Sequence, residues 1–375
     1  MMRWFLLGIA LAFAGLGLLT VFRLPDSINW KFSVLAGQFG YVAALVPLIV
    51  GIAGWRLKSG SGSLALSTCA VSLFAFVLLV QPCFQAWLVG WRLPAKLEAK
   101  FGPAKMDRKP FTFGGLFHAW PKEAPKTTWA YSGSLKLVFY PAIGRNPAPC
   151  VVVIHGGGWD DGDRGQITNF NDGLARAGIA VADISYRLAP GAPWPAQRED
   201  VGLAVAFVKL HAPEWGVDRS RIVIFGRSAG GQIAEASAYA LHDPDVRGVI
   251  ALYAPSDMNF AWKWGRPDDA LDSPELMRKF LGGTPETAKA AYDSASALNF
   301  VTPKTPPTLL VHGTIDTLVW IRHSRRLSAK LNGAGVANLL VELPWGTHAL
   351  ELNPDSPSGQ LTNYAVLWFV GAVCR

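Results

Sequence analysis

Residues 225–231, with the sequence FGRSAGG, constrain the fold more than any other stretch of the chain. They follow a short apolar run and precede a segment of small residues, a pattern that indicates a strand, a sharp turn and a helix. Gly226 and Gly230 stand on either side of Ser228, at positions where a Cβ would collide with the adjoining strand or helix. The pattern therefore predicts that Ser228 is exposed at a helix N-terminus. The alternative is a chance G-x-S-x-G in a glycine-rich chain, and the surrounding sequence must decide between the two.

The chain after residue 134 alternates between short β-rich runs and helical patterns. The runs are mostly apolar throughout, as expected for strands that are buried on both faces. This repetition predicts an α/β fold with a mostly parallel sheet and helices on both faces, whose functional groups gather at the carboxyl ends of the strands. The expected strands are 135–140, 150–154, 179–184, 222–225, 249–252, 308–311 and 339–343, and the expected helices are 165–177, 196–211, 228–241, 322–332 and 360–371.

One connection in this region is too long to be a simple loop. Residues 256–307 contain two tryptophans and a helical pattern near 274–281. Long insertions between strand ends are usually functional, so we expect this segment to cover part of the site and to shape a substrate pocket. The expected α/β domain is 134–375, and the stretch at 92–133, rich in Pro, Gly and Lys, is expected to be a linker.

A serine on such a turn is a weak nucleophile until a histidine takes its proton and a carboxylate orients that histidine. His348 follows the last expected strand, and Asp316 directly follows another strand. The order Ser228, Asp316, His348 is the one that this sheet topology requires. His348 alone is compatible with a surface loop, and Asp316 alone with a helix cap. Their joint placement at the required strand ends predicts catalytic roles for all three residues.

The glycine-rich stretch at 155–159, HGGGW, follows another apolar run. The oxyanion that forms when a serine attacks a carbonyl needs preorganised backbone N–H groups, and consecutive glycines let the main chain approach the substrate. We expect Gly157, Gly158 and Ala229, the residue after the serine, to donate these hydrogen bonds. The alternatives are a plain glycine turn and a phosphate-binding loop, but the Lys-Ser/Thr ending of the latter is missing.

The N-terminal region contains three runs without charged residues, at 4–22, 34–54 and 59–91. Each run is long enough to cross a hydrocarbon layer about 30 Å thick, and tryptophans lie near the ends of the runs, as at a headgroup boundary. We therefore expect residues 1–91 to form three transmembrane helices. A cleaved signal peptide in place of the first helix is an alternative, but no small-residue cleavage site follows it. A helical core buried in a soluble protein is another, at odds with three successive charge-free runs.

Basic residues cluster at 92–109, directly after the third apolar run. By the positive-inside rule, an integral protein of the inner or plasma membrane then has residues 134–375 on the cytoplasmic side.

The net charge of +8 does not indicate nucleic-acid binding, because no zinc spacing, base-stacking motif or phosphate loop accompanies it. We expect the cluster to face anionic membrane lipids, with a plain solvated linker as the alternative. The four cysteines show no disulfide framework.

Over roughly residues 135–370 the chain resembles the α/β-hydrolases of the hormone-sensitive-lipase-like esterase group. The resemblance rests on HGGGW at 155–159, YRLAP at 186–190, the stretch 193–200 and GRSAG at 226–230. It implies an α/β-hydrolase fold and a carboxylic ester hydrolase with the three catalytic residues named above. By the same likeness, the Tyr186 segment braces the loop that binds the oxyanion, and Asp200 holds the scaffold.

Three features depart from this group. The acid motif HGTID at 312–316 is more similar to dienelactone-hydrolase and peptidase-like relatives. Arg227 replaces the commoner acidic or amide residue before the nucleophile, and the sequence offers no explanation for it. A membrane anchor before such a hydrolase is similar to the arrangement in isoprenylcysteine methylesterases, which implies a lipidated or membrane-dissolved substrate.

The sequence therefore predicts a membrane-anchored serine hydrolase that cleaves hydrophobic or lipid-like carboxylic esters through an acyl-enzyme, without a metal or an organic cofactor. Two alternatives stay open. One is an amidase or peptidase with the same triad, and the other is a catalytically silent membrane scaffold that keeps the fold for partner binding. No motif specifies the acyl length, the alcohol or the oligomeric state.

Overall fold

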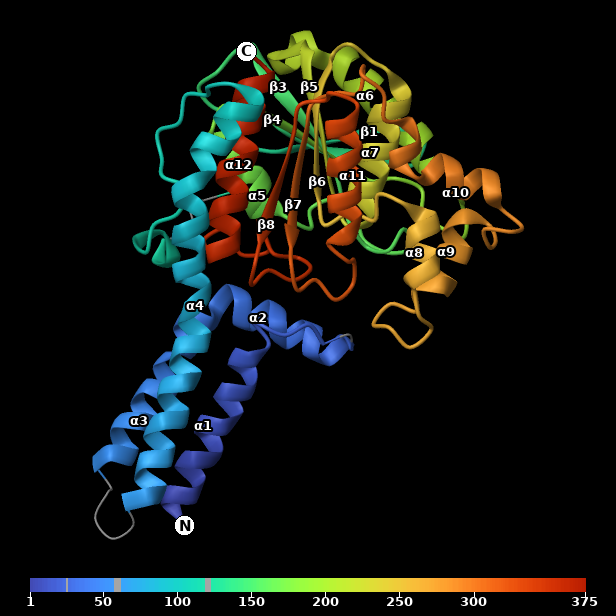
Figure 1. The fold of residues 1–375 in the computed structure, drawn as a ribbon. Helices are drawn as coiled ribbons and strands as arrows, with labels where there is room; N and C mark the ends of the chain where they lie inside the picture. Colours follow the sequence, from blue (N-terminus) through green and yellow to red (C-terminus); the bar gives the residue numbers. More distant parts are fainter. Residues whose placement is uncertain (25, 57–61, 119–122) are drawn as a thin grey trace.

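The computed structural model describes residues 1–375 except 25, 57–61 and 119–122. Its central element is a sheet built from β1 (Thr127–Ser132), β2 (Leu135–Tyr140), β3 (Ala148–Ile154), β4 (Ala180–Ile184), β5 (Val217–Arg227), β6 (Val246–Leu252), β7 (Thr308–Gly313) and β8 (Asn338–Leu343). These eight strands lie in the order β1-β2-β4-β3-β5-β6-β7-β8 (Figure 1). β2 pairs antiparallel with β1 and with β4, and the other pairs are parallel. The predicted mostly parallel sheet is confirmed.

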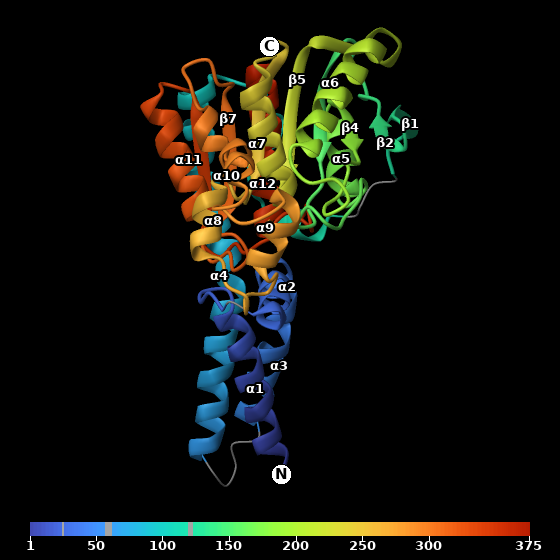
Figure 2. The ribbon, with the colours of Figure 1, turned by 90° about the vertical axis from the view of Figure 1, so that its right-hand side faces the viewer.

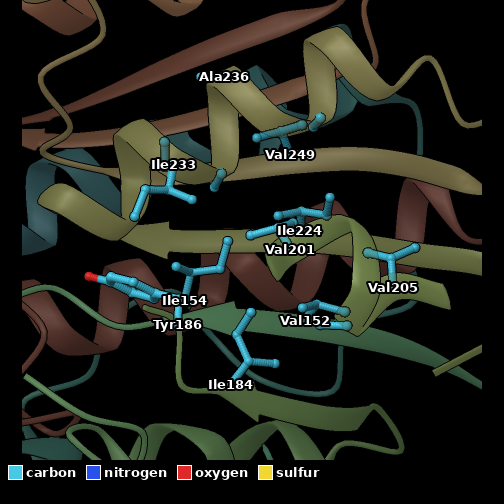
Figure 3. Close-up of a cluster of buried hydrophobic side chains, with 14 of the residues drawn as sticks. Val152, Ile154, Ile184, Tyr186, Val201, Val205, Ile224, Ile233, Ala236 and Val249 are labelled. Carbon is cyan, nitrogen blue, oxygen red and sulfur yellow. The ribbon is translucent and has the colours of Figure 1, made fainter. Parts of the chain in front are cut away.

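Helices cover both faces of the sheet. One face carries α6 (Ala196–Trp215), α7 (Ala229–Leu241) and α11 (Arg322–Gly333). The other face carries α5 (Thr168–Arg176), α12 (Pro357–Val373) and the C-terminal half of α4 (Gly62–Phe101). Alternate side chains of β3 enter the two cores, because Val152 and Ile154 pack with the first layer and Val151 and Val153 with the second. Figure 3 shows the first of these cores.

The sequence missed the first strand of this sheet. β1 lies inside the expected linker, and the first four of its six residues are not buried. An edge strand of this kind lacks the apolar run by which the buried strands were recognised.

The expected insertion at 256–307 folds into short helices between β6 and β7. They are α8 (Met258–Trp264), α9 (Ser273–Leu281), α10 (Lys289–Ala295) and η2 (Ala297–Phe300). A separate short helix, η1 (Gly114–Phe117), lies in the expected linker and not in this insertion. Side chains of α8 and α9 line a cavity together with Ser228, so the insertion forms part of the wall around the serine.

In the described residues, the sheet domain is preceded by α1 (Met2–Leu18), α2 (Ser27–Ala43), α3 (Leu45–Arg56) and α4. α1 and α3 pack along the N-terminal half of α4, whereas α2 lies across the end of this bundle, next to the sheet domain (Figure 1 and Figure 2). The N-terminus lies at the opposite end of the bundle from the sheet domain (Figure 1).

The expectation of three transmembrane helices is corrected by this arrangement. Among the described residues, α4 alone is by itself long and apolar enough to cross a membrane. α1 has 17 residues, which at 1.5 Å per residue gives about 26 Å, less than the hydrocarbon thickness. α2 and α3 meet the same criteria only as a pair bent by 52°. The lengths of the apolar runs did not reveal where these helices end or bend.

α4 has 40 residues and continues past the expected boundary at residue 91. Its C-terminal half packs against α12 and β8, and Leu93 and Leu97 are buried in the core on that face of the sheet. One continuous helix therefore joins the N-terminal bundle to the sheet domain, and the expected linker at 92–133 begins inside it.

Candidate active site

Ser228 lies at the turn between β5 and α7. Its φ of 54° and ψ of −123° are unusual for a residue with a side chain. A Cβ on Gly226 would lie 2.0 Å from the carbonyl oxygen of Gly230, and a Cβ on Gly230 would lie 2.3 Å from that of Ile154. Both positions therefore require glycine, and the close approach that they allow holds Ser228 on a tight turn.

The structure brings Ser228, His348 and Asp316 together from three strand ends. His348 Nε2 lies 2.8 Å from Ser228 Oγ, and His348 Nδ1 lies 2.8 Å from Asp316 Oδ2. Asp316 follows β7 and His348 follows β8, and both side chains are buried. In this geometry a proton can pass from Ser228 to His348 while Asp316 holds the orientation of the imidazole.

Asp316 has further partners that keep it ionised. Its Oδ1 accepts hydrogen bonds from the backbone N–H groups of Leu318 and Val319, each 2.9 Å long, and His312 Nε2 lies 3.3 Å from its Oδ2. Burial acts to raise the pKa of Asp316, but His348 and His312 outweigh burial and hold this pKa well below its ordinary value. The sequence analysis gave His312 no role, although it is the first residue of the HGTID motif.

The glycine loop, residues 155–159, passes close to Ser228. Gly157 and Gly158 have φ values of 124° and 61°, a region that favours glycine. Both line a cavity together with Ser228, and Ala229 lines an adjoining cavity with Gly158 and Ser228. The three residues expected to bind an oxyanion therefore all lie around the serine.

Tyr186 and Asp200 hold the chain next to the glycine loop. Tyr186 OH donates a 3.2 Å hydrogen bond to the carbonyl oxygen of His155, and the two rings stack with centroids 4.2 Å apart. Asp200 accepts a 2.8 Å hydrogen bond from the backbone N–H of Arg187 and pairs with its guanidinium. These contacts agree with the structural roles that the resemblance implies for both residues.

Arg227, for which the sequence offers no explanation, is buried and ion-paired. Its Nη1 donates to Glu351 Oε1 over 2.6 Å, and its Nη2 donates to Gln166 Oε1 over 2.5 Å. Tyr253 OH donates to the same oxygen of Glu351, and the Tyr253 ring lies 4.3 Å from the His348 ring, centroid to centroid. Arg227 therefore belongs to a buried network behind the histidine. Sequence reasoning missed its partners; the available signal was that an arginine inside a packed turn needs a buried carboxylate.

Two cavities meet at Ser228. The smaller cavity has a volume of about 320 Å³, and the larger, which includes His348 and the glycine loop, has a volume of about 780 Å³. Two residues from the N-terminal region line them as well: Arg23 borders the smaller cavity and Trp30 the larger. The apolar side chains along the smaller cavity include Phe260, Trp264, Leu276, Met277, Leu318 and Val319.

The described part of the chain contains no group of three or more His, Cys, Asp or Glu side chains that could hold a metal ion. The four cysteines are free thiols.

This sheet order, with a serine turn after β5 and an acid and a histidine after β7 and β8, defines an α/β-hydrolase. Residues 137–331 match the BD-FAE family, which is just over half of the chain. The chain belongs to this family and, with it, to the hormone-sensitive-lipase-like α/β-hydrolases, so the resemblance drawn from the sequence motifs is confirmed.

Two relatives are similar to this chain over about 220 to 240 residues. Esterase LipC of Mycobacterium tuberculosis is 28% identical over 244 residues, which cover 61% of this chain and 59% of the relative. The probable carboxylic ester hydrolase LipM of the same organism is 30% identical over 221 residues, which cover 55% of this chain and 50% of the relative. This chain thus spans between half and three-fifths of the length of these two relatives. A solved structure of a bacterial heroin esterase is similar with a TM-score of 0.60 and 22% identity, over 75% of this chain and 91% of that one, a likeness in fold.

Proposed function

We propose that this chain is a serine hydrolase that cleaves carboxylic esters. The observation that carries the proposal is the hydrogen-bonded row of Asp316, His348 and Ser228, which ends at a cavity bordered by the glycine loop. The names of the relatives LipC and LipM support an ester as the bond that is cleaved.

In the proposed reaction, Ser228 Oγ attacks the ester carbonyl while its proton moves to His348 Nε2. Asp316 stabilises the imidazolium, and the N–H groups of the glycine loop and of Ala229 bind the oxyanion. His348 then gives the proton to the departing alcohol, which leaves an acyl-serine. In the second half, His348 takes a proton from water, the resulting hydroxide attacks the acyl-serine, and the carboxylic acid is released as Ser228 regains its proton.

We also propose that the N-terminal helices hold the protein in a membrane. α4 is apolar enough to span it, and α1, α3 and the N-terminal half of α4 expose large apolar side chains that a bilayer would cover. Because α2 lies between this bundle and the sheet domain (Figure 1), the active site would lie close to the membrane surface. Hydrophobic or lipid-like esters are therefore the proposed substrates. Among these exposed side chains are Trp4, Phe5, Leu11, Ile49, Ile52, Leu66, Leu73, Phe74 and Val77.

The Ser228→Ala variant tests the reaction. It should lower kcat/KM for short p-nitrophenyl esters by about a thousandfold or more and abolish labelling by a fluorophosphonate probe, while the melting temperature stays close to that of the parent protein. The exposed Ser220→Ala is a matched control and should behave like the parent. Unchanged ester hydrolysis by Ser228→Ala would show that another group is the nucleophile.

A further inference from the structure

The N-terminal region contributes to the walls of the active site. Arg23, in the segment between α1 and α2, lines the smaller cavity together with Ser228. Trp30, in the first turn of α2, lines the larger one. Both views of the fold place α2 directly beneath the sheet domain (Figure 1 and Figure 2). The pocket is therefore formed by two regions of the chain. A residue of the N-terminal region can thus contact the substrate and influence which substrate is bound.

The proposed reaction determines which part of an ester enters each cavity. The departing alcohol oxygen must come within reach of His348 Nε2, which protonates it. His348 lines the larger cavity and not the smaller one, so the alcohol occupies the larger cavity. The acyl group then extends into the smaller cavity, past Gly158 and Ala229 and between the apolar side chains of α8 and α9. This step rests on the proposed function.

Arg23 brings a positive charge to this acyl cavity. Its guanidinium carbon lies 4.5 Å from the centre of the Trp320 ring, which also lines the cavity. Among the described residues, no carboxylate forms an ion pair with Arg23, whereas Arg266 on the same cavity pairs with Asp268 over 2.5 Å. Stacking on an indole keeps a guanidinium oriented and leaves its N–H groups able to donate elsewhere.

The neighbouring ionisable groups form no ion pair with Arg23. The negative charge of Asp316 acts on Arg23, but the Asp316 carboxylate is hydrogen-bonded to His348. Burial lowers the pKa of His323 to about 3, so His323 is neutral at physiological pH. Asp269 is engaged with its own loop, because its Oδ1 accepts hydrogen bonds from the backbone N–H groups of Leu271 and Ser273. The acyl cavity thus combines apolar walls with the Arg23 guanidinium, which forms no ion pair with a carboxylate in the described part of the chain.

We propose that Arg23 binds an anionic oxygen group at the far end of the acyl moiety. The preferred substrates are then esters whose acyl chain ends in a carboxylate, such as monoesters of dicarboxylic acids. The apolar walls contact the aliphatic part of the chain, and the guanidinium donates charge-assisted hydrogen bonds to its terminal carboxylate. A bilayer lipid with an anionic headgroup offers the same chemistry from another source, and the experiment distinguishes the two.

The test compares two series of p-nitrophenyl esters on the full-length protein in a non-ionic detergent. One series is acid-terminated (adipate, suberate and sebacate monoesters), and the other is neutral with matched chain lengths (hexanoate, octanoate and decanoate). The parent protein should prefer the acid-terminated member of at least one pair. Arg23→Gln should lower the ratio of kcat/KM, acid-terminated over neutral, by about tenfold, as expected for loss of a charge-assisted hydrogen bond, and Arg23→Lys should lower it less.

Arg322→Gln is the matched control, because Arg322 stands over the same Trp320 ring at 5.2 Å but does not line the cavity. Its ratio should equal that of the parent. Equal losses on both series in Arg23→Gln, no loss, or a loss that appears only when anionic lipid is added would overturn the inference. The proposed function would still stand in those cases, since in this experiment it is contradicted by a different result, a parent protein that hydrolyses neither series.

Discussion

Glu235 is a carboxyl group on α7 without exposed surface. Burial raises its pKa from the ordinary value of 4.5 to about 8. The folded protein therefore binds this proton more tightly than the unfolded chain does. It follows that the contribution of Glu235 to the free energy of unfolding is greatest at low pH, falls as the pH rises from about 4.5 to about 8, and changes no further above this window.

The Glu235→Gln variant should remove this loss, because an amide of the same shape cannot ionise. The difference in free energy of unfolding, variant minus parent, should therefore grow between pH 5 and pH 8 by about 3 kcal/mol. Denaturant unfolding in detergent at both pH values measures the difference. Exposed Glu286→Gln serves as the control and should show no such gain. A shift of equal size at both pH values would mean that Glu235 is ionised throughout.

Arg227 is a second buried ionisable group, but it is charged and ion-paired, whereas Glu235 is kept neutral by its raised pKa. Arg227 is 5% exposed and its partner Glu351 is 1% exposed, with 2.6 Å between Nη1 and Oε1. A buried pair of this kind adds little net stability, but loss of one partner leaves a charge without compensation, at about 3–5 kcal/mol. The pair therefore explains how an arginine is accommodated inside the serine turn, and it fixes Tyr253 against the His348 ring.

Among the secondary-structure elements, the sequence predicted best those with a clear apolar pattern. β3, β5, β7 and β8 contain the apolar runs that are expected of strands in a covered parallel sheet. Ser228, Asp316 and His348 could be proposed as site residues because each lies just beyond such a run. The edge strand β1 was missed because it has no such run. The break at Ala44 between α2 and α3 was missed because the apolar pattern of 34–54 continues through it.

Contacts between distant segments could not be predicted from local patterns. Glu351 pairs with a residue 124 positions away, and Arg23 and Trp30 reach cavities whose other walls lie more than a hundred residues later. Local periodicity shows that such side chains belong to helices or loops, but not which surface they meet. Arg23 and Trp30 are part of the site only because the region around α2 lies against the sheet domain.

α2 contacts the segment that carries His348, the proposed base. Gln38 is 2% exposed; its Nε2 donates a 2.9 Å hydrogen bond to the carbonyl oxygen of Ala349, and its Oε1 accepts a 2.7 Å hydrogen bond from the backbone N–H of Asn353. Ala349 directly follows His348 and has a positive φ of 63°. Gln38 is therefore a positioning residue for the His348 loop.

The Gln38→Met variant should keep the volume of the side chain and remove both hydrogen bonds. We expect kcat for a neutral p-nitrophenyl ester to fall about tenfold with KM nearly unchanged, because a displaced base affects the chemical step more than binding. Gln81→Met is the matched control: Gln81 Nε2 donates to Thr20 Oγ1 over 3.0 Å, a contact within the N-terminal region. If both variants lost stability and activity in parallel, Gln38 would have only a structural role and would not position His348.

In the whole molecule, α4 links the two regions without a break. If the N-terminal bundle crosses a membrane, as proposed, this one helix decides on which side the sheet domain lies. Only five of the 35 Lys and Arg residues precede Arg92, and six fall within 92–109. Basic residues close to the end of a span oppose translocation. This distribution favours the sheet domain on the cytoplasmic side and the N-terminus, at the far end of the bundle (Figure 1), on the outer side.

Protease added to intact bacterial cells whose outer membrane has been opened should therefore leave the sheet domain uncut. An epitope tag fused to Met1 gives the internal control, since it lies at the opposite end of the bundle and should be removed under the same conditions. After permeabilisation of the inner membrane, both parts should be digested. Removal of the sheet domain while the tag stays protected would reverse the orientation, and protection of both would show that the N-terminal bundle does not cross the membrane.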